Sequence, residues 1–304
     1  MILLYHNVVP ADAPPGYACT ALALPVADFR RHMIWLARHF TMVSLADHVT
    51  AWRRSPRATK GMVSVTFDDG SATTFRCVRP ILEETRVPAT VFVTTCHLEH
   101  GPLIWGAYLN ALCFENAYSV LNIDARRYEL ATPAQRLAAR RNLAGLAHAS
   151  GDPARFATDL ARAYPLPEAI RPYYEGMTST QLRAAGASDL IEIGAHAVTH
   201  RDLSSLPRDV QAWEIRESRR VLAELCGTSV RYFAYPSGDY DDRTLAVVSE
   251  MGFEAAFATA SRRLGAQPHL EINRVGVYSR SLLKLLAKTA GLTGLARRLG
   301  LPSG

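Results

Sequence analysis

Two pairs of polar residues have the composition of a hydrolytic metal site. Asp68 and Asp69 end an apolar, β-branched run, and His196 and His200 follow a second apolar run. Adjacent carboxylates repel each other, and an unpaired buried carboxylate is costly. A divalent cation removes both penalties, because it can bind one Asp and two His and leave a coordination position open for water, as in catalytic zinc sites. The second carboxylate can then act as a base on that water.

Each pair alone has an ordinary explanation. An Asp-Asp-Gly triplet is often only a turn, and two histidines four residues apart can be surface side chains. Both pairs, however, follow strand-like runs of what reads as one βα domain. Functional residues of (β/α) barrels collect at the carboxyl ends of the strands, so the shared position favours chemistry.

The elements that must position these residues are strands alternating with helices. This alternation predicts an α/β architecture with a mostly parallel sheet. We expect strands at residues 2–5, 40–43, 62–67, 89–93, 190–193, 232–235, 255–259 and 274–277, and helices at 25–40, 73–84, 209–226 and 244–251.

The pattern changes at about residues 98–177, where alanine and arginine dominate and no strong strand is visible. We expect a helical insertion in a single domain that spans residues 1–278, followed by a tail at 279–304. The insertion is either a packing element or a wall that shapes the substrate site.

Three segments, in order, resemble the leading motifs of the polysaccharide deacetylases with a NodB homology domain, carbohydrate esterase family 4. They are TFDDG at residues 66–70, HAVTH at 196–200 and RYFAYPSG at 231–238. LYH at 4–6 and NRVGV at 273–277 are similar to the variants whose first strand carries "YH". The resemblance covers about residues 1–100 and 177–278, and it implies a distorted (β/α) barrel.

The resemblance also implies roles for individual residues. Asp69, His196 and His200 would hold the metal, and Asp68 would be the general base for a metal-bound water that attacks an acetamide carbonyl. Zinc lowers the pKa of such a water and polarises the carbonyl. The backbone N–H of Ser237 would complete an oxyanion hole with the metal.

A histidine must then protonate the departing amine. Most family members take it from a C-terminal Leu-x-His motif, which we do not find in this chain. In the biofilm poly-N-acetylglucosamine deacetylases the histidine of "YH" has this role, so His6 is our candidate and His269 is its rival. We also expect Tyr235 and Pro236, in the third motif, to contact substrate.

The chain departs from the family pattern at two positions. Ala197 stands where a Ser or Thr usually makes a loop-stabilising hydrogen bond, and Ala234 stands where an Arg often orients the base. We expect Arg274, from the last strand, to take the place of that Arg.

These observations predict a metal-dependent hydrolase that removes N-acetyl groups from amino sugars of a glycan or glycan precursor. Zinc is the expected metal, although nitrogen and oxygen ligands also accept cobalt and nickel. Two alternatives remain open. The same site could cleave O-acetyl esters or a C–N bond of a small molecule. Alternatively, the chain could be an inactive glycan-binding module, an interpretation that only Ala197 and Ala234 support.

Composition excludes several other classes. The 304 residues carry a net charge of +6, with 48% hydrophobic and 20% charged residues, which is typical of a globular protein and not of a disordered, collagen-like or coiled-coil chain. Five cysteines without a CxxC pair argue against a disulfide framework and against a cysteine-ligated zinc site. No RNA-binding signature points to nucleic acid.

The two ends of the chain bear on its location. The first ten residues have no basic region of the kind that begins a signal peptide, so we expect a cytoplasmic protein. Residues 281–299 form a basic, leucine-rich amphipathic pattern. This tail either lies at the inner face of the membrane as an interfacial helix or packs on the barrel.

Overall fold

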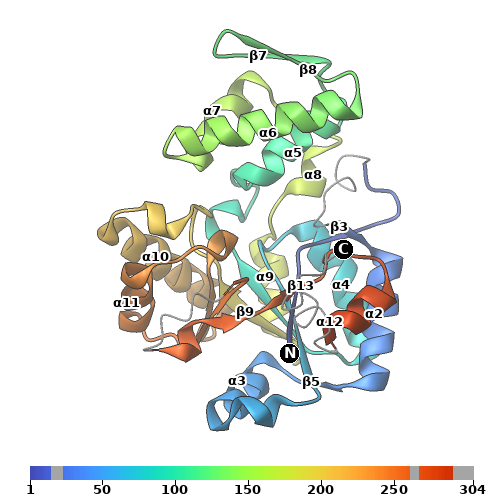
Figure 1. The fold of residues 1–304 in the computed structure, drawn as a ribbon, viewed down its shortest axis with the longest axis vertical. Coiled ribbons are helices and arrows are strands. Elements are labelled where there is room, and N and C mark those ends of the chain that lie inside the picture. The colour runs from blue at the N-terminus through green and yellow to red at the C-terminus, as the bar shows by residue number, and fades with distance from the viewer. Residues whose placement is uncertain (15–22, 261–266, 290–304) are drawn as a thin grey trace, which may run out of the picture.

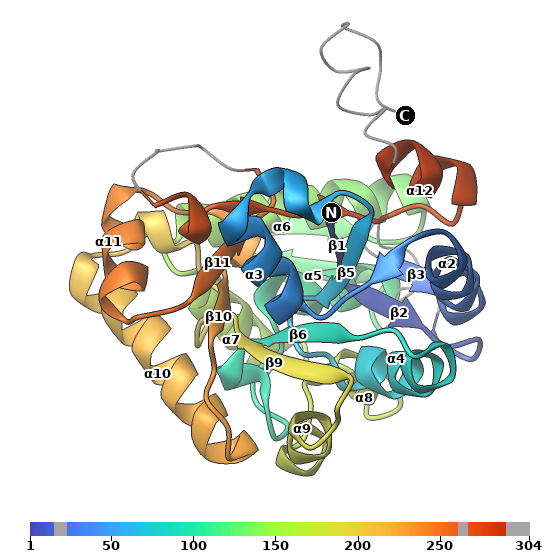
Figure 2. The same cartoon turned by 90° about the horizontal axis from the view of Figure 1, so that it is seen from below.

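The computed structural model describes residues 1–14, 23–260 and 267–289. Its centre is a nearly closed barrel of parallel strands flanked by helices, which confirms the predicted fold class (Figures 1 and 2). In spatial order, the strands of the barrel are β12 (Ile272–Asn273), β11 (Ala255–Ala258), β10 (Tyr232–Ala234), β9 (Ile191–Ala195), β6 (Ala89–Val93), β5 (Met62–Phe67), β1 (Ile2–Tyr5) and β13 (Val275–Gly276).

The short segment of residues 272–276 joins the two ends of this strand order. Its first half, β12, pairs with β11, and its second half, β13, pairs with β1. The single residue between the two halves is Arg274, whose backbone N–H donates to the carbonyl of Ala258. The side chain of Arg274 is therefore held at the point where the barrel closes, and it is fully buried.

Alternation along the strands separates two apolar cores. Side chains such as Ile2, Phe92 and Phe257 form a cluster with Leu45 and Val49 of α3. The opposite faces pack against the outer helices in a larger cluster. These helices are α2 (Val26–His39), α4 (Ala72–Thr85), α9 (Ser179–Gly186), α10 (Arg208–Cys226) and α11 (Asp242–Glu250), whereas α3 (Leu45–Arg54) belongs to the first cluster.

Three short strands lie beside the barrel. β2 (Asn7–Val9) and β3 (Ala23–Pro25) form a separate parallel pair, and β4 (Thr41–Met42) pairs with the start of β5.

Residues 105–174, between β6 and α9, form a separate layer over one end of the barrel, and this layer has its own apolar core (Figure 1). Besides helices it contains an antiparallel hairpin, which the sequence analysis did not predict. The two turn residues, Asp124 and Ala125, both have positive φ. Such turns usually carry glycine, so Asp-Ala is a weak signal. The elements are α5 (Trp105–Phe114), β7 (Val120–Ile123), β8 (Arg126–Glu129), α6 (Pro133–Ala149), α7 (Pro153–Ala163) and α8 (Arg171–Tyr174).

The described part of the tail is α12 (Leu282–Thr289), which packs on the barrel through the buried Leu285 while Leu283 and Leu286 are exposed. The rest of the predicted basic helix, to residue 299, lies outside the described residues. Within the described residues no helix is long and apolar enough to cross a membrane. The four described cysteines are free thiols, and Cys19 lies outside the described residues.

Candidate active site

The predicted metal ligands follow strands that lie on either side of β6. Asp69 follows β5, and His196 and His200 follow β9. Thr94, which follows β6, joins the two loops: its backbone N–H donates to the Asp69 carbonyl at 3.4 Å, and its hydroxyl donates to the His196 carbonyl at 3.2 Å. Residues 127 positions apart thus meet because their strands share one neighbour.

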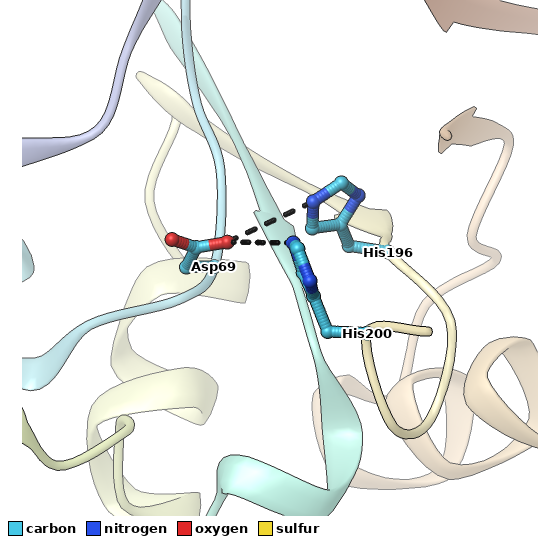
Figure 3. Close-up of side chains that lie close together, drawn as sticks. All are labelled: Asp69, His196 and His200. Atoms are coloured by element: carbon cyan, nitrogen blue, oxygen red, sulfur yellow. Dashed lines mark ion pairs between the residues drawn. The ribbon is translucent and has the colours of Figure 1, made fainter. Parts of the chain in front are cut away.

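The side chains of Asp69, His196 and His200 point toward one another (Figure 3). Asp69 Oδ1 lies 3.7 Å from His196 Nε2 and 3.4 Å from His200 Nε2. His196 Nδ1 lies 2.8 Å from the Ala234 carbonyl, which can only accept, so Nδ1 carries the proton and Nε2 keeps its lone pair for the cluster.

This cluster fits a divalent cation. The three ligand atoms lie within 4.8 Å of one another. Two ligands at usual zinc distances from a tetrahedral ion are about 3.4 Å apart, close to the separations in the cluster. Asp69 Oδ1 is also buried, and no described residue forms a hydrogen bond with it. A cation at this point would satisfy that oxygen.

Local backbone conformation is unusual at the site. Asp69, His200 and Ser237 have φ values of 76°, 58° and 56°, in the left-handed region that few non-glycine residues adopt. Asp and His are among the side chains that tolerate it best. Gly70, which follows at φ 75°, lies so close to Val93 that a Cβ would be 2.9 Å from its side chain. Strained turns of this kind cluster at active sites.

Asp68 is bound by Arg274. Nη1 of Arg274 lies 2.6 Å from Oδ1 of Asp68 and Nη2 lies 2.7 Å from Oδ2, and both side chains are buried. Burial raises the pKa of the Asp68 carboxyl, but the charges of Arg274 and His196 outweigh it, and the net shift is downward. Arg274 therefore occupies the position relative to Asp68 that we expected of it.

The remaining titratable groups of the cluster are also shifted. Burial lowers the pKa of His196 to about 4, so its imidazole is neutral at neutral pH. Burial opposes the charged forms of Asp69 and His200 too. Their electrostatic attraction, across 3.4 Å between Asp69 Oδ1 and His200 Nε2, outweighs this effect, so the pKa of Asp69 falls and that of His200 rises.

Glu214, fully buried on α10, holds the loop that carries the two histidines. Its carboxylate accepts from the backbone N–H groups of Val198 and Thr199 at 2.8 and 2.9 Å, and also from the Thr199 hydroxyl. Arg201 binds Glu214 at 3.1 Å and Asp152 of the insertion at the same distance. The loop is thus anchored although Ala197 has no hydroxyl.

One cavity of about 570 Å³ is lined by Asp68 and by the three predicted metal ligands. The barrel contributes both aspartates and both histidines together with His6, Asn7, Ser237, Gly238, Thr259 and Tyr278. The insertion contributes the other wall: Ile104, Trp105, Gly106, Ala107, Asn110, Phe114, Leu137, Arg140 and Tyr174. The insertion therefore shapes the site, which was one of the two roles we considered for it.

The structure separates the two candidate acids. His6 lines the cavity, with its ring centroid 5.8 Å from that of Tyr278, whereas His269 does not line it. The expectation for Tyr235 and Pro236 needs correction. Both are buried and neither lines the cavity, and the Tyr235 hydroxyl donates to the Leu270 carbonyl.

Several cavity residues were missed by sequence reasoning. Tyr278 follows the last matched motif, and Trp105 and Arg140 belong to the insertion, which has no counterpart in the motifs. An aromatic residue just beyond a predicted terminal strand was the one signal available for Tyr278.

Comparison with known proteins agrees with this architecture. The model of the family described as polysaccharide deacetylase matches residues 55–118 and 161–256. Among solved structures, the chain is similar to the Streptococcus pyogenes deacetylase PplD in complex with acetate, at 20% identity over 91% of each chain and a TM-score of 0.55.

Two further structures are similar at 17% identity. IcaB from Ammonifex degensii is matched over 95% of each chain with a TM-score of 0.57. A putative polysaccharide deacetylase from Bacillus anthracis is matched over 95% of this chain and 67% of its own, with a TM-score of 0.56. These likenesses establish the fold. No curated protein matches the sequence.

Proposed function

Because the chain belongs to the polysaccharide deacetylase family, whose members hydrolyse the carbon–nitrogen bond of amides, we propose that it removes N-acetyl groups from amino sugars of a glycan or glycan precursor. One observation carries the proposal: the Asp69–His196–His200 cluster and the Asp68–Arg274 pair line or adjoin a single cavity. The cavity is large enough for sugar residues, since small-molecule sites are usually about 300–1,000 Å³.

Asp69, His196 and His200 would hold the metal, for which zinc is our proposal. A divalent ion there supplies a water of lowered pKa and polarises the substrate carbonyl. Asp68 accepts the proton of the attacking water, because Arg274 keeps its carboxylate ionised and fixed in orientation.

The other roles concern the carbonyl oxygen and the leaving group. Ser237 lines the cavity, and its backbone N–H donates to the oxygen as negative charge develops on it. His6 gives a proton to the amine nitrogen as the C–N bond breaks. Hydrolysis then yields acetate and a free amino sugar.

The test is acetate release from N-acetylglucosamine oligomers by the purified protein, after metal removal with a chelator and after zinc is restored. We expect no release without metal and full recovery with it. Asp68→Asn should keep one metal ion per chain but lose about 10²–10⁴-fold in rate, the usual contribution of a general base. Asp209→Asn, an exposed change on α10, serves as the matched control.

Three outcomes would contradict parts of the proposal. A wild-type rate in Asp68→Asn would contradict the assignment of Asp68 as the general base. Metal retained at full stoichiometry in both His200→Ala and Asp69→Ala would remove the ligand assignment. Acetate released from O-acetylated xylan but from no N-acetyl sugar would instead identify an esterase.

A further inference from the structure

Arg140 projects from α6 of the insertion into the wall of the active-site cavity. The buried residues of α6, Ala139, Leu143 and Ala147, pack in the apolar core of the insertion, while Arg140 is half-buried and lines the cavity with Leu137. The guanidinium lies beside α5, where Nη2 is 3.4 Å from the Gly106 carbonyl.

This guanidinium has no counter-ion among the described residues. Its one hydrogen bond to a described residue is the long contact with Gly106, although a guanidinium carries five N–H donors. Three other partly or fully buried arginines are paired with carboxylates: Arg201 with Glu214, Arg231 with Glu192, and Arg274 with Asp68. The partly buried Arg136 and Arg219 have no carboxylate partner among the described residues, but each donates to two backbone carbonyls, whereas Arg140 donates to one.

Leaving a partly buried cation unpaired is unfavourable, and burial lowers the pKa of Arg140. The described cavity lining offers no spare carboxylate to compensate. Its acidic residues are Asp68, which Arg274 binds, and Asp69, which faces the two histidines. The Arg140 guanidinium is therefore a positive group that lines the cavity and has no negative partner among the described residues.

From this we infer that the substrate carries an anionic group, a carboxylate or a phosphate, and that Arg140 binds it in the same cavity that hydrolyses the N-acetyl group. The inference rests on the proposed function and specifies its substrate as an acidic glycan. Trp105 and Phe114 of the same wall offer apolar surface to the sugar rings. The planar fork of arginine suits bidentate binding of either anion.

The experiment uses two oligosaccharides that differ in one group. The first alternates N-acetylglucosamine with glucuronic acid, and the second is the same oligosaccharide after reduction of its carboxylates to alcohols. We expect the wild-type kcat/KM to favour the acidic form by about tenfold or more, as for a charge-assisted hydrogen bond. Arg140→Gln should abolish this ratio, and Arg140→Lys should keep part of it.

Arg141→Gln is the matched control, because it removes the same charge from the next residue of α6, which is exposed and does not line the cavity. It should leave the ratio unchanged. A third substrate, phosphorylated on N-acetylglucosamine and uncharged elsewhere, distinguishes the sources of the anion: a larger Arg140-dependent preference for it identifies phosphate rather than carboxylate.

An equal kcat/KM for the acidic and neutral forms, together with no Arg140-dependent preference for the phosphorylated one, would overturn the anion site and leave the deacetylase proposal standing. Failure to release acetate from any substrate would instead count against the proposed function. Calorimetric binding of the acidic and phosphorylated oligosaccharides to wild-type and Arg140→Gln protein then decides the anion site separately. Equal affinities would overturn it, and a loss confined to Arg140→Gln would support it.

Discussion

Arg274 and Asp68 form a bidentate ion pair within the barrel, with nitrogen–oxygen distances of 2.6 and 2.7 Å. The two residues are 206 positions apart. They meet because the segment containing Arg274 closes the barrel beside β1, which in turn pairs with β5, the strand that Asp68 directly follows. Closure of the fold and orientation of the proposed base therefore depend on the same five-residue segment.

Arg274→Gln should reduce kcat/KM by about 10²-fold or more, because a misplaced catalytic group loses its alignment. The positive charge of Arg274 lowers the pKa of Asp68, so its removal raises that pKa. Asp68 must be ionised to act as a base, and the acid limb of the pH–rate profile should therefore move to higher pH. Kinetics from acid to neutral pH measure this shift.

A folding control is needed, because removing one partner of a buried ion pair costs about 3–5 kcal/mol. Arg274→Lys keeps the charge but not the fork, so it should retain the position of the acid limb better than Arg274→Gln does. If both folded variants kept the wild-type acid limb, Arg274 would not act through Asp68.

His6→Gln should slow hydrolysis of the N-acetyl amide by about 10²–10⁴-fold while sparing 4-nitrophenyl acetate, whose leaving group departs without a proton. The ratio of the two rates is the measurement. His269→Gln is the control, since His269 does not line the cavity. An equal loss on both substrates would show that His6 is not the acid.

Glu214→Gln should weaken metal binding by about 10–100-fold, the usual effect of changing a group that orients metal ligands. The amide can no longer accept all the hydrogen bonds from Val198, Thr199 and Arg201. Metal affinity is measured by competition with a chromogenic chelator. Glu217→Gln, on the same helix but partly exposed, should bind metal as the wild type does.

The titration of His48 should make the folded protein less stable as the pH is lowered. Burial and the nearby N-terminal ammonium lower its pKa from 6.5 to about 4. Between these values the unfolded chain binds a proton that the folded chain does not, so the free energy of unfolding should decrease as pH falls, by up to about 3 kcal/mol.

Urea unfolding of the wild type and of His48→Gln at several pH values tests this prediction. The variant should have the smaller pH dependence between about pH 6.5 and 4. His39→Gln, at an exposed histidine of α2, should behave like the wild type. Identical slopes for wild type and His48→Gln would contradict the assignment.

The hydrophobic pattern along the sequence was sufficient to predict that the candidate catalytic and metal-binding residues lie at the ends of strands. Apolar runs that stop at Asp68 and before His196 indicate where a strand ends, and parallel strands bring their carboxyl ends to one edge. The predicted positions of these strands and of α2, α4, α10 and α11 agree with the structure to within a few residues, whereas α3 and α9 were not predicted. These positions were predicted from the spacing of apolar and polar residues, which involves only residues close together in sequence and is therefore visible in the sequence itself.

Which side chains face the cavity was decided by the tertiary structure. Tyr235 is the last residue of a strand predicted at 232–235 and directly follows β10 in the structure, yet its side chain packs against Tyr240 rather than facing the cavity. Arg140 lies in a segment whose pattern shows only a helix, and its exposure to the cavity depends on how the insertion covers the barrel. Periodicity determines which face of an element is apolar. Which other element packs against each face depends on contacts between segments far apart in sequence, and only the folded structure shows those contacts.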